Sequence, residues 1–317
     1  MWMWVAIFGI LISSFILSKS ADLLILAIVR LSRKFHISEF NMGFFILGFA
    51  TTTPELFVGI NSIISNHPQL SLGNLLGASI LLLTLVIGLQ AIAVKEIRFI
   101  DTFKAQDLWF TSFIIALPTL LLFDGQYSRL DGILTLCLFF IFFMFMNRRQ
   151  TLLENVMQTL ETPHNHILKN VLRVAAGIVG LAIGAKIMVM SGLYISEVLK
   201  IADELVGLLM LALGTNLPEL TVLLKVITKQ HKNLGLGDFL GSAVANTLVL
   251  GLLAVTRPVI LDAPYKIFFS FGVLYLALIL FNAFFKADKK ITRNEGIVLI
   301  ALYSFFVFSE IFLKNRL

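Results

Sequence analysis

Long apolar stretches separated by short polar connections run along the entire chain. A helix that crosses a bilayer needs about 20 predominantly apolar residues. Ten stretches come close to that length, and we expect spans at 5–29, 40–65, 71–94, 107–123, 130–146, 167–190, 204–228, 235–256, 264–285 and 294–313. Each is predicted to be helical, because a lone span in lipid must satisfy its backbone hydrogen bonds internally. The predicted fold class is therefore an all-α membrane protein with ten transmembrane helices.

The composition excludes an ordinary soluble domain. Hydrophobic residues make up 58% of the 317 residues and charged residues only 14%, whereas soluble chains carry about 25% charged residues. The first apolar stretch is longer than the roughly 7–15-residue core of a signal peptide, so we interpret it as a span. The single cysteine, Cys137, excludes a disulfide framework and any multi-cysteine metal site.

The positions of Lys and Arg predict the orientation, because cytoplasmic connections are enriched in these residues. With the N-terminus outside, the inside connections carry 17 of the 25 and the outside segments carry 6. We therefore expect both termini outside and the longest connection, 147–166, in the cytoplasm. This placement accounts for the net charge of +6 without a nucleic-acid partner. The lack of a long regulatory connection favours a bacterial or archaeal cell (inner) membrane.

The chain contains an internal repeat with an offset of 164 residues. Between 43–79 and 207–243, 14 of 37 positions are identical, and Thr-x-x-Pro-Glu occurs in register in both halves. Each half, 1–146 and 167–317, contains five predicted spans, and 147–166 links them. Because five is odd, we expect the second half to enter the membrane inverted. Inverted repeats place a shared site near the bilayer midplane, where broken helices from the two halves meet.

Two prolines predict where the second and seventh helices are broken. Pro54 and Pro218 lack a backbone N–H, and their rings clash with the carbonyl four residues earlier. The carbonyls of Ala50 and Gly214 are therefore expected to be free, close to threonine, asparagine and glutamate side chains. Hard cations such as Ca²⁺ and Na⁺ prefer oxygen donors of these kinds.

The two repeats resemble the α-repeats of the cation/calcium exchanger superfamily, whose members include the sodium/calcium exchangers. The matching stretches are Ser20 to Leu24, Ile37 to Glu39, Thr51 to Leu56 and Gly73 to Gly77 in the first half, with Gly184 to Lys186, Gly214 to Leu220 and Gly237 to Ser242 in the second. The resemblance covers essentially the whole chain. It implies side-chain ligands for the transported cations at Thr51, Thr52, Glu55, Thr215, Asn216, Glu219, Ser242 and Asn246, and carbonyl ligands at Gly48 and Ala212.

The first repeat departs from the family pattern in the span over 71–94. The family has a serine and, four residues later, an asparagine or aspartate, as Ser242 and Asn246 show in the second repeat. Ala78 and Leu82 stand at the equivalent positions and have no side-chain oxygen. We therefore expect a lopsided site in which fewer sodium ions are coupled and protons substitute for them.

Other membrane residues have structural as well as functional interpretations. A charge at the bilayer centre costs about 2.5–3.5 kcal/mol and usually has a function, which favours a ligand role for Glu55 and Glu219. Asp238 fits the capping of a helix start and also gating or ion access, and both interpretations stay open. Asp22 and Lys186 are expected to form an ion pair, because paired charges cost less in lipid.

The leading functional prediction is a secondary antiporter that exchanges Ca²⁺, or a related cation, for Na⁺ or H⁺. No phosphate-binding Gly-x-x-x-x-Gly-Lys-Ser/Thr motif occurs, so ATP-driven pumping by this chain is not expected. Two facing carboxylates would neutralise one divalent ion and oppose each other's ionisation when empty, which makes proton coupling physically reasonable. The expected partners are inorganic cations and the lipid bilayer, with no covalently bound cofactor. The oligomeric state is not predicted.

Two alternatives remain at the level of sequence. Gly235-Leu-Gly-Asp238 satisfies the Gly-x-Gly-Asp pattern of intramembrane aspartyl proteases, but the Tyr-Asp that often accompanies it does not occur. Such a short pattern is weak support in a chain rich in Gly and Leu. The eroded first repeat also leaves open a relative that no longer transports.

Overall fold

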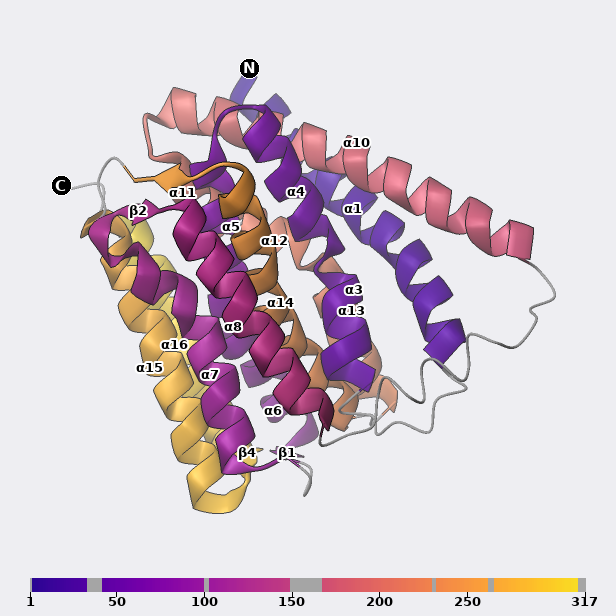
Figure 1. Ribbon diagram of the computed structural model, residues 1–317, viewed down its shortest axis with the longest axis vertical. Coiled ribbons are helices and arrows are strands. Elements are labelled where there is room, and N and C mark those ends of the chain that lie inside the picture. Colours follow the sequence, from indigo (N-terminus) through magenta and orange to yellow (C-terminus); the bar gives the residue numbers. More distant parts are fainter. Residues whose placement is uncertain are drawn as a thin grey trace.

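The computed structural model describes residues 2–32, 42–99, 103–148, 167–229, 232–261 and 265–312. These residues form a bundle of helices with four very short strands (Figure 1). Among them, nine helices are long and apolar enough to span a membrane. A bent pair, Asp203–Thr215 with Leu217–Thr228, supplies a tenth when it is counted as one span. The predicted all-α membrane fold is confirmed for the described part of the chain.

The first half is a series of helices in which the second span is interrupted. Its elements are α1 (Trp2–Ser32), the π-helical turn η1 (Met42–Leu47), α3 (Gly48–Thr51), α4 (Thr53–Ile64), α5 (Pro68–Leu81), the π-helical turn η2 (Leu82–Val86), α6 (Ile87–Val94), β1 (Glu96–Arg98), α7 (Ala105–Leu121), the 3₁₀ turn η3 (Leu122–Asp124), β2 (Gln126–Tyr127) and α8 (Arg129–Arg148). The helix stops at Thr51 and resumes at Thr53, with Pro54 in the first turn of α4. Proline is tolerated there because the first N–H groups of a helix have no acceptor within it.

The second half has an interrupted span at the equivalent place. Its elements are α10 (Ile167–Leu199), α11 (Asp203–Val206), the π-helical turn η4 (Gly207–Leu211), α12 (Ala212–Thr215), α13 (Leu217–Lys229), α14 (Lys232–Thr256), β3 (Val259–Ile260), α15 (Tyr265–Asp288), β4 (Lys290–Thr292) and α16 (Arg293–Phe312). The chain bends by 44° between α12 and α13. A π-helical turn precedes the break in each half, and such turns are frequent at functional sites.

Helices of the two halves pack on each other in a crossed pattern that glycines make possible. A Cβ atom on Gly77 of α5 would lie 2.1 Å from the carbonyl oxygen of Leu208 in η4. A Cβ atom on Gly241 of α14 would lie 2.2 Å from the carbonyl oxygen of Phe44 in η1. Both the glycines and their partners are related by the offset of 164. These repeat-equivalent glycines therefore allow close packing of the helices.

Two short antiparallel ribbons also connect the halves, and the sequence patterns did not predict them. Strand β1 pairs with β4 through Ile97 and Ile291, and strand β2 pairs with β3 through Tyr127 and Val259. Each ribbon therefore takes one strand from each half. They lie at opposite ends of the molecule (Figure 1).

The long helices α1 and α10 lie side by side, inclined to the remaining helices (Figure 1). Most of a second hydrophobic cluster, distinct from the large one, comes from these two helices, and α4, α5, α11 and η4 add one residue each. The predicted ion pair between α1 and α10 is wrong. Asp22 lies 3.6 Å from Lys19, one turn away on the same helix, and Lys186 is exposed.

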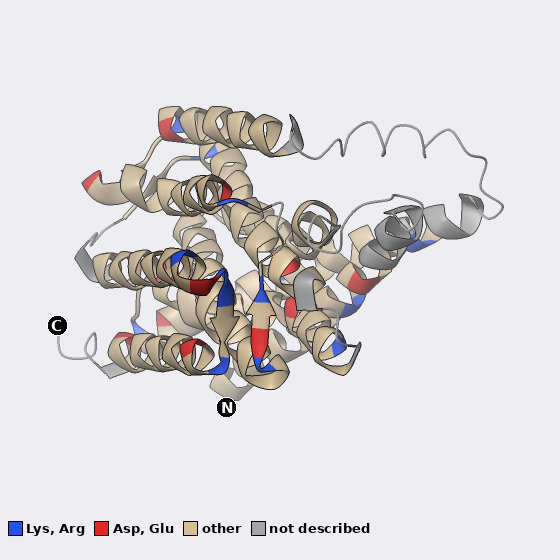
Figure 2. Ribbon diagram, turned by 90° about the horizontal axis from the view of Figure 1, so that it is seen from below, with Lys and Arg blue, Asp and Glu red and all other residues tan. Residues whose placement is uncertain are grey.

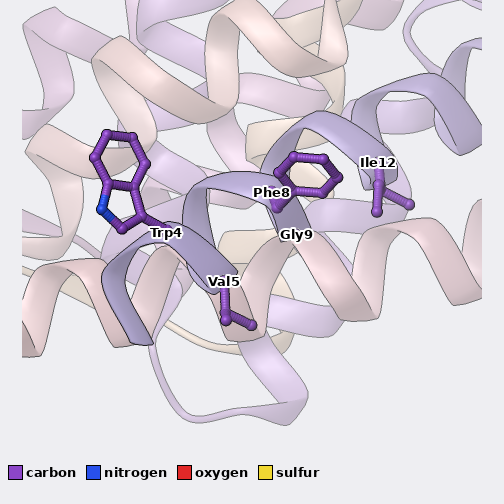
Figure 3. A pocket seen from close by; sticks show the side chains of 5 residues that line it. All are labelled: Trp4, Val5, Phe8, Gly9 and Ile12. Atoms are coloured by element: carbon purple, nitrogen blue, oxygen red, sulfur yellow. The ribbon is translucent and has the colours of Figure 1, made fainter. Parts of the chain in front are cut away.

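The outer surface of α1 carries a shallow apolar groove of about 470 Å³. It is lined by Trp4, Val5, Phe8, Gly9 and Ile12 (Figure 3). The four larger side chains are between 47% and 75% exposed, as expected for a helix face that meets lipid. The groove contains none of the predicted cation ligands.

Positive charges mark one end of the bundle. Arg98 and Lys290 lie in β1 and β4, and Lys95 and Lys289 directly precede these strands. Strands β1 and β4 lie at the bottom of Figure 1, and Figure 2 shows the molecule from below, with Lys and Arg in blue. The connection 147–166 lies outside the described residues except for its first two, which end α8.

Candidate cation-binding site

The break in the first half brings two threonine hydroxyls to the centre of the bundle. Thr52, which separates α3 from α4, donates to the Gly48 carbonyl at 2.6 Å. The Thr51 hydroxyl lies 3.0 Å from the Leu47 carbonyl and 2.9 Å from the Ser242 hydroxyl. Both threonines thus bond back to their own helix, as membrane hydroxyls commonly do. Thr51 also contacts α14 of the other half, so its hydroxyl lies at the interface of the two repeats.

The break in the second half is built in the same way. The Asn216 side-chain amide donates to the Ala212 carbonyl at 2.7 Å, and its Oδ1 is buried without a hydrogen-bond partner. The Thr215 hydroxyl donates to Oδ1 of Asn74 in α5 at 3.2 Å. Asn74 had no predicted role, although it is repeat-equivalent to Asp238.

Glu55 and Glu219 are the two buried carboxylates that follow the prolines. Each is 1% exposed and lies in the first turn of its helix, α4 or α13. A helix N-terminus stabilises a negative charge at this position. Both oxygens of Glu55 and Oε2 of Glu219 have no hydrogen-bond partner. The carboxylates interact electrostatically with each other, and each lies beside the threonine of the other repeat: Glu55 beside Thr215, and Glu219 beside Thr51.

Helix α14 supplies a stripe of three polar residues to this region. Asp238, Ser242 and Asn246 are each at most 3% exposed. The capping interpretation of Asp238 is wrong, because α14 begins at Lys232 and Asp238 lies well inside the helix. Instead, Asp238 Oδ1 lies 3.4 Å from the Thr51 hydroxyl. The Ser242 hydroxyl lies 3.3 Å from the Gly48 carbonyl.

The stripe on the first-half helix is poorer in oxygen atoms. Ala78 and Leu82 are completely buried and carry no polar side-chain atom. Their neighbour Ser79 was missed by the sequence analysis, because it lies one residue out of the repeat register. Its hydroxyl accepts a hydrogen bond from the Asn246 side-chain amide at 3.2 Å, and Oδ1 of Asn246 has no partner.

The structure thus brings all eight predicted side-chain ligands into one buried region between the broken helices. Leaving a buried polar atom unpaired costs about 1–3 kcal/mol, and several oxygens here are unpaired together. Among the described residues, no group of three or more His, Cys, Asp or Glu side chains is arranged to hold a metal ion. The donors are instead a mixture of carboxylate, amide, hydroxyl and carbonyl oxygens, which suits hard cations.

Comparison with known proteins identifies a family whose sequence profile matches both halves of the chain. The sequence profile of the family described as sodium/calcium exchanger protein matches residues 5–147 and 169–312, one stretch in each half. The chain belongs to this exchanger family. The exchanger is 27% identical over 293 residues to an uncharacterized membrane protein of Methanocaldococcus jannaschii, covering 92% of this chain and 94% of the relative. It is 24% identical over 339 residues to the sodium/calcium exchanger MaX1 of Methanosarcina acetivorans, covering 92% and 94%.

The fold of the exchanger is similar to a solved structure of the sodium-calcium exchanger NCX_Mj soaked with Na⁺ and Sr²⁺. The TM-score is 0.70 at 24% identity, over 97% of this chain and 99% of that chain. The family is one of transporters, so the exchanger is not an enzyme, and the protease interpretation of Asp238 is excluded.

Proposed function

We propose that this protein is a secondary active antiporter that exchanges Ca²⁺, or a related cation, for Na⁺ or H⁺ across a membrane. The observation that carries the proposal is the pair of repeat-equivalent carboxylates, Glu55 and Glu219. They are buried at the breaks of two helices and have oxygens without hydrogen-bond partners. The relatives named as sodium/calcium exchangers support the same class of cation.

The proposed ligands of the transported cations are Thr51, Thr52, Glu55, Thr215, Asn216, Glu219, Ser242 and Asn246, with the carbonyls of Gly48 and Ala212. Two carboxylates neutralise one divalent cation, and the neutral oxygens replace part of its water shell. When the cation leaves, the hydroxyls keep the carbonyl contacts seen here, such as Thr52 to Gly48 at 2.6 Å. The empty site therefore retains most of its hydrogen bonds, and the carboxylates are the groups that a new cation or a proton must satisfy.

The two crossed halves suit an alternating-access cycle around this fixed site, as in other inverted-repeat transporters. We propose that both termini lie outside and that 147–166 lies in the cytoplasm of a bacterial or archaeal cell. The Lys and Arg residues around β1 and β4 support this orientation, since they are at the end to which α8 runs before that connection (Figures 1 and 2).

Flux into proteoliposomes tests the function directly. Purified protein is reconstituted, and ⁴⁵Ca²⁺ uptake is followed under an outward Na⁺ gradient and, separately, under a pH gradient. We expect uptake under at least one gradient. Glu55→Gln and Glu219→Gln should each reduce uptake to the level of empty liposomes, while Glu197→Gln, on the exposed part of α10, should leave it unchanged. Unchanged uptake in either site variant would refute the assignment of these carboxylates, and no uptake under either gradient would favour a relative that does not transport.

A further inference from the structure

The two ends of the site differ by one charge at a pair of repeat-equivalent residues. Asp238 in α14 lies 3.4 Å from the Thr51 hydroxyl. Asn74 in α5 lies 3.2 Å from the Thr215 hydroxyl. The same contact between a broken helix and the helix that crosses it thus involves a carboxylate at one end and a neutral amide at the other.

Asp238 is not stabilised by its surroundings alone. It is 0% exposed, its Oδ2 has no hydrogen-bond partner, and its Oδ1 has only the long contact to Thr51. Among the described residues, no Lys, Arg or His lies within salt-bridge distance of it. It interacts electrostatically with the carboxylate of Glu219, which is of the same sign. A buried carboxylate without a positive partner is costly in a membrane protein unless a proton or a bound cation neutralises its charge.

The oxygens around Asp238 form a compact group. Thr51 lies 2.9 Å from Ser242, and Ser242 lies 3.3 Å from the Gly48 carbonyl. One carboxylate with hydroxyl and carbonyl oxygens carries a single negative charge, which matches a small monovalent cation better than a divalent one. At the other end, Asn74 is neutral and Ala78 replaces the hydroxyl of Ser242, so the equivalent group lacks both the charge and one oxygen.

We propose that Asp238 is a specificity-determining ligand that retains one monovalent cation, Na⁺ in the first instance, at the α14 end of the site. The α5 end retains none. The proposal rests on the proposed exchange function, and it makes the two ends of an otherwise repeated site chemically unequal. The divalent ion stays with Glu55 and Glu219, and Asp238 determines how tightly a monovalent ion is held beside it.

Equilibrium binding of ²²Na⁺ and ⁴⁵Ca²⁺ to purified protein in lipid nanodiscs tests this assignment. Asp238→Asn removes the charge difference between the two ends with almost no change in volume, and the Ser242 hydroxyl stays in place. Loss of a residue that only supports a metal ligand already weakens binding about 10–100-fold, so we expect at least a tenfold weaker ²²Na⁺ affinity. We expect ⁴⁵Ca²⁺ affinity without Na⁺ to change far less. Asn74→Asp is the matched variant, and it should add a sodium-binding subsite and raise the Hill coefficient for Na⁺.

The outcomes separate this proposal from the proposed function. Equal weakening of Na⁺ and Ca²⁺ binding in Asp238→Asn would indicate a merely structural role and overturn the proposal, as would unchanged Na⁺ binding. If that variant does not fold, Asn74→Asp decides, and an unchanged Hill coefficient there overturns the proposal. Normal Ca²⁺ binding in Glu55→Gln and Glu219→Gln would instead overturn the proposed function.

Discussion

Replacing Gly77 by alanine should force the two halves apart at the site. The new Cβ atom would lie 2.1 Å from the Leu208 carbonyl oxygen, whereas real Cβ contacts are essentially never shorter than 3.0 Å. The obstacle is backbone and cannot rotate away, so α5 and η4 must separate by about 1 Å in a closely packed interior. Overpacking of this kind costs about 1–3 kcal/mol. Because η4 leads directly into α12 and Thr215, the displacement also reaches the proposed ligands.

Two measurements check this prediction. The melting temperature of the detergent-purified protein, followed by size-exclusion chromatography, should fall, and Gly241→Ala should lower it similarly, because its Cβ would lie 2.2 Å from the Phe44 carbonyl oxygen. A displacement of about 1 Å can cost about 100-fold in rate, so ⁴⁵Ca²⁺ flux should fall more steeply than stability.

The matched control is Gly272→Ala in α15, where a Cβ atom meets nothing within 4 Å. Alanine there should be neutral or stabilise the helix by about 0.5–1 kcal/mol, because it reduces the freedom of the unfolded chain. If Gly77→Ala has the same melting temperature as Gly272→Ala and transports Ca²⁺ normally, the crossed packing does not position the site.

Three further predictions follow from the site and the topology. The combined change Ala78→Ser and Leu82→Asn should raise the Hill coefficient for Na⁺-driven Ca²⁺ flux. A Hill coefficient that is already high in the unmodified protein, and that is the same in the double variant, would contradict the lopsided site. Ser79→Ala should weaken Ca²⁺ binding, because the Asn246 side-chain amide loses its hydrogen-bond acceptor. Ser62→Ala removes a hydroxyl that bonds only to its own helix, and it should leave Ca²⁺ binding unchanged. A single cysteine introduced at 147–166, in a background without the native cysteine, should not react with membrane-impermeant reagents in intact cells. Labelling at that cysteine would show that the proposed orientation is wrong.

The features that the sequence revealed are those with a local cause. Spans follow from apolar length, and the two breaks follow from Pro54 and Pro218, which remove a donor wherever they stand in a helix. The repeat then predicted that Glu55 and Glu219 belong to the same site, because the same motif occurs at equivalent positions of two halves that share one site. None of these features depends on which helix packs on which.

The features that the sequence did not reveal depend on long-range contacts. Ser79 joins the site only because α14 passes it and presents Asn246. The interior position of Asp238 depends on where α14 begins, and the polar residues 230–233 do not mark that start clearly. Asp22 pairs with Lys19, and Lys186 lies on an exposed face of α10, which the repeat alignment does not encode.

The crossed ribbons and glycine contacts have a consequence for how the protein is made. Thr51 meets Ser242 at a separation of 191 residues, and β1 finds its partner strand only in the last part of the chain. When the first five helices have entered the membrane, Gly77 has no η4 against which to pack, and β1 has no strand with which to pair. The first half is therefore in the bilayer before the glycine surface of α5 is packed and before β1 is paired. Unpaired strand edges are prone to pair with the wrong segment. The two halves should accordingly acquire protease resistance together, at the end of synthesis, and neither should be stable when made without the other.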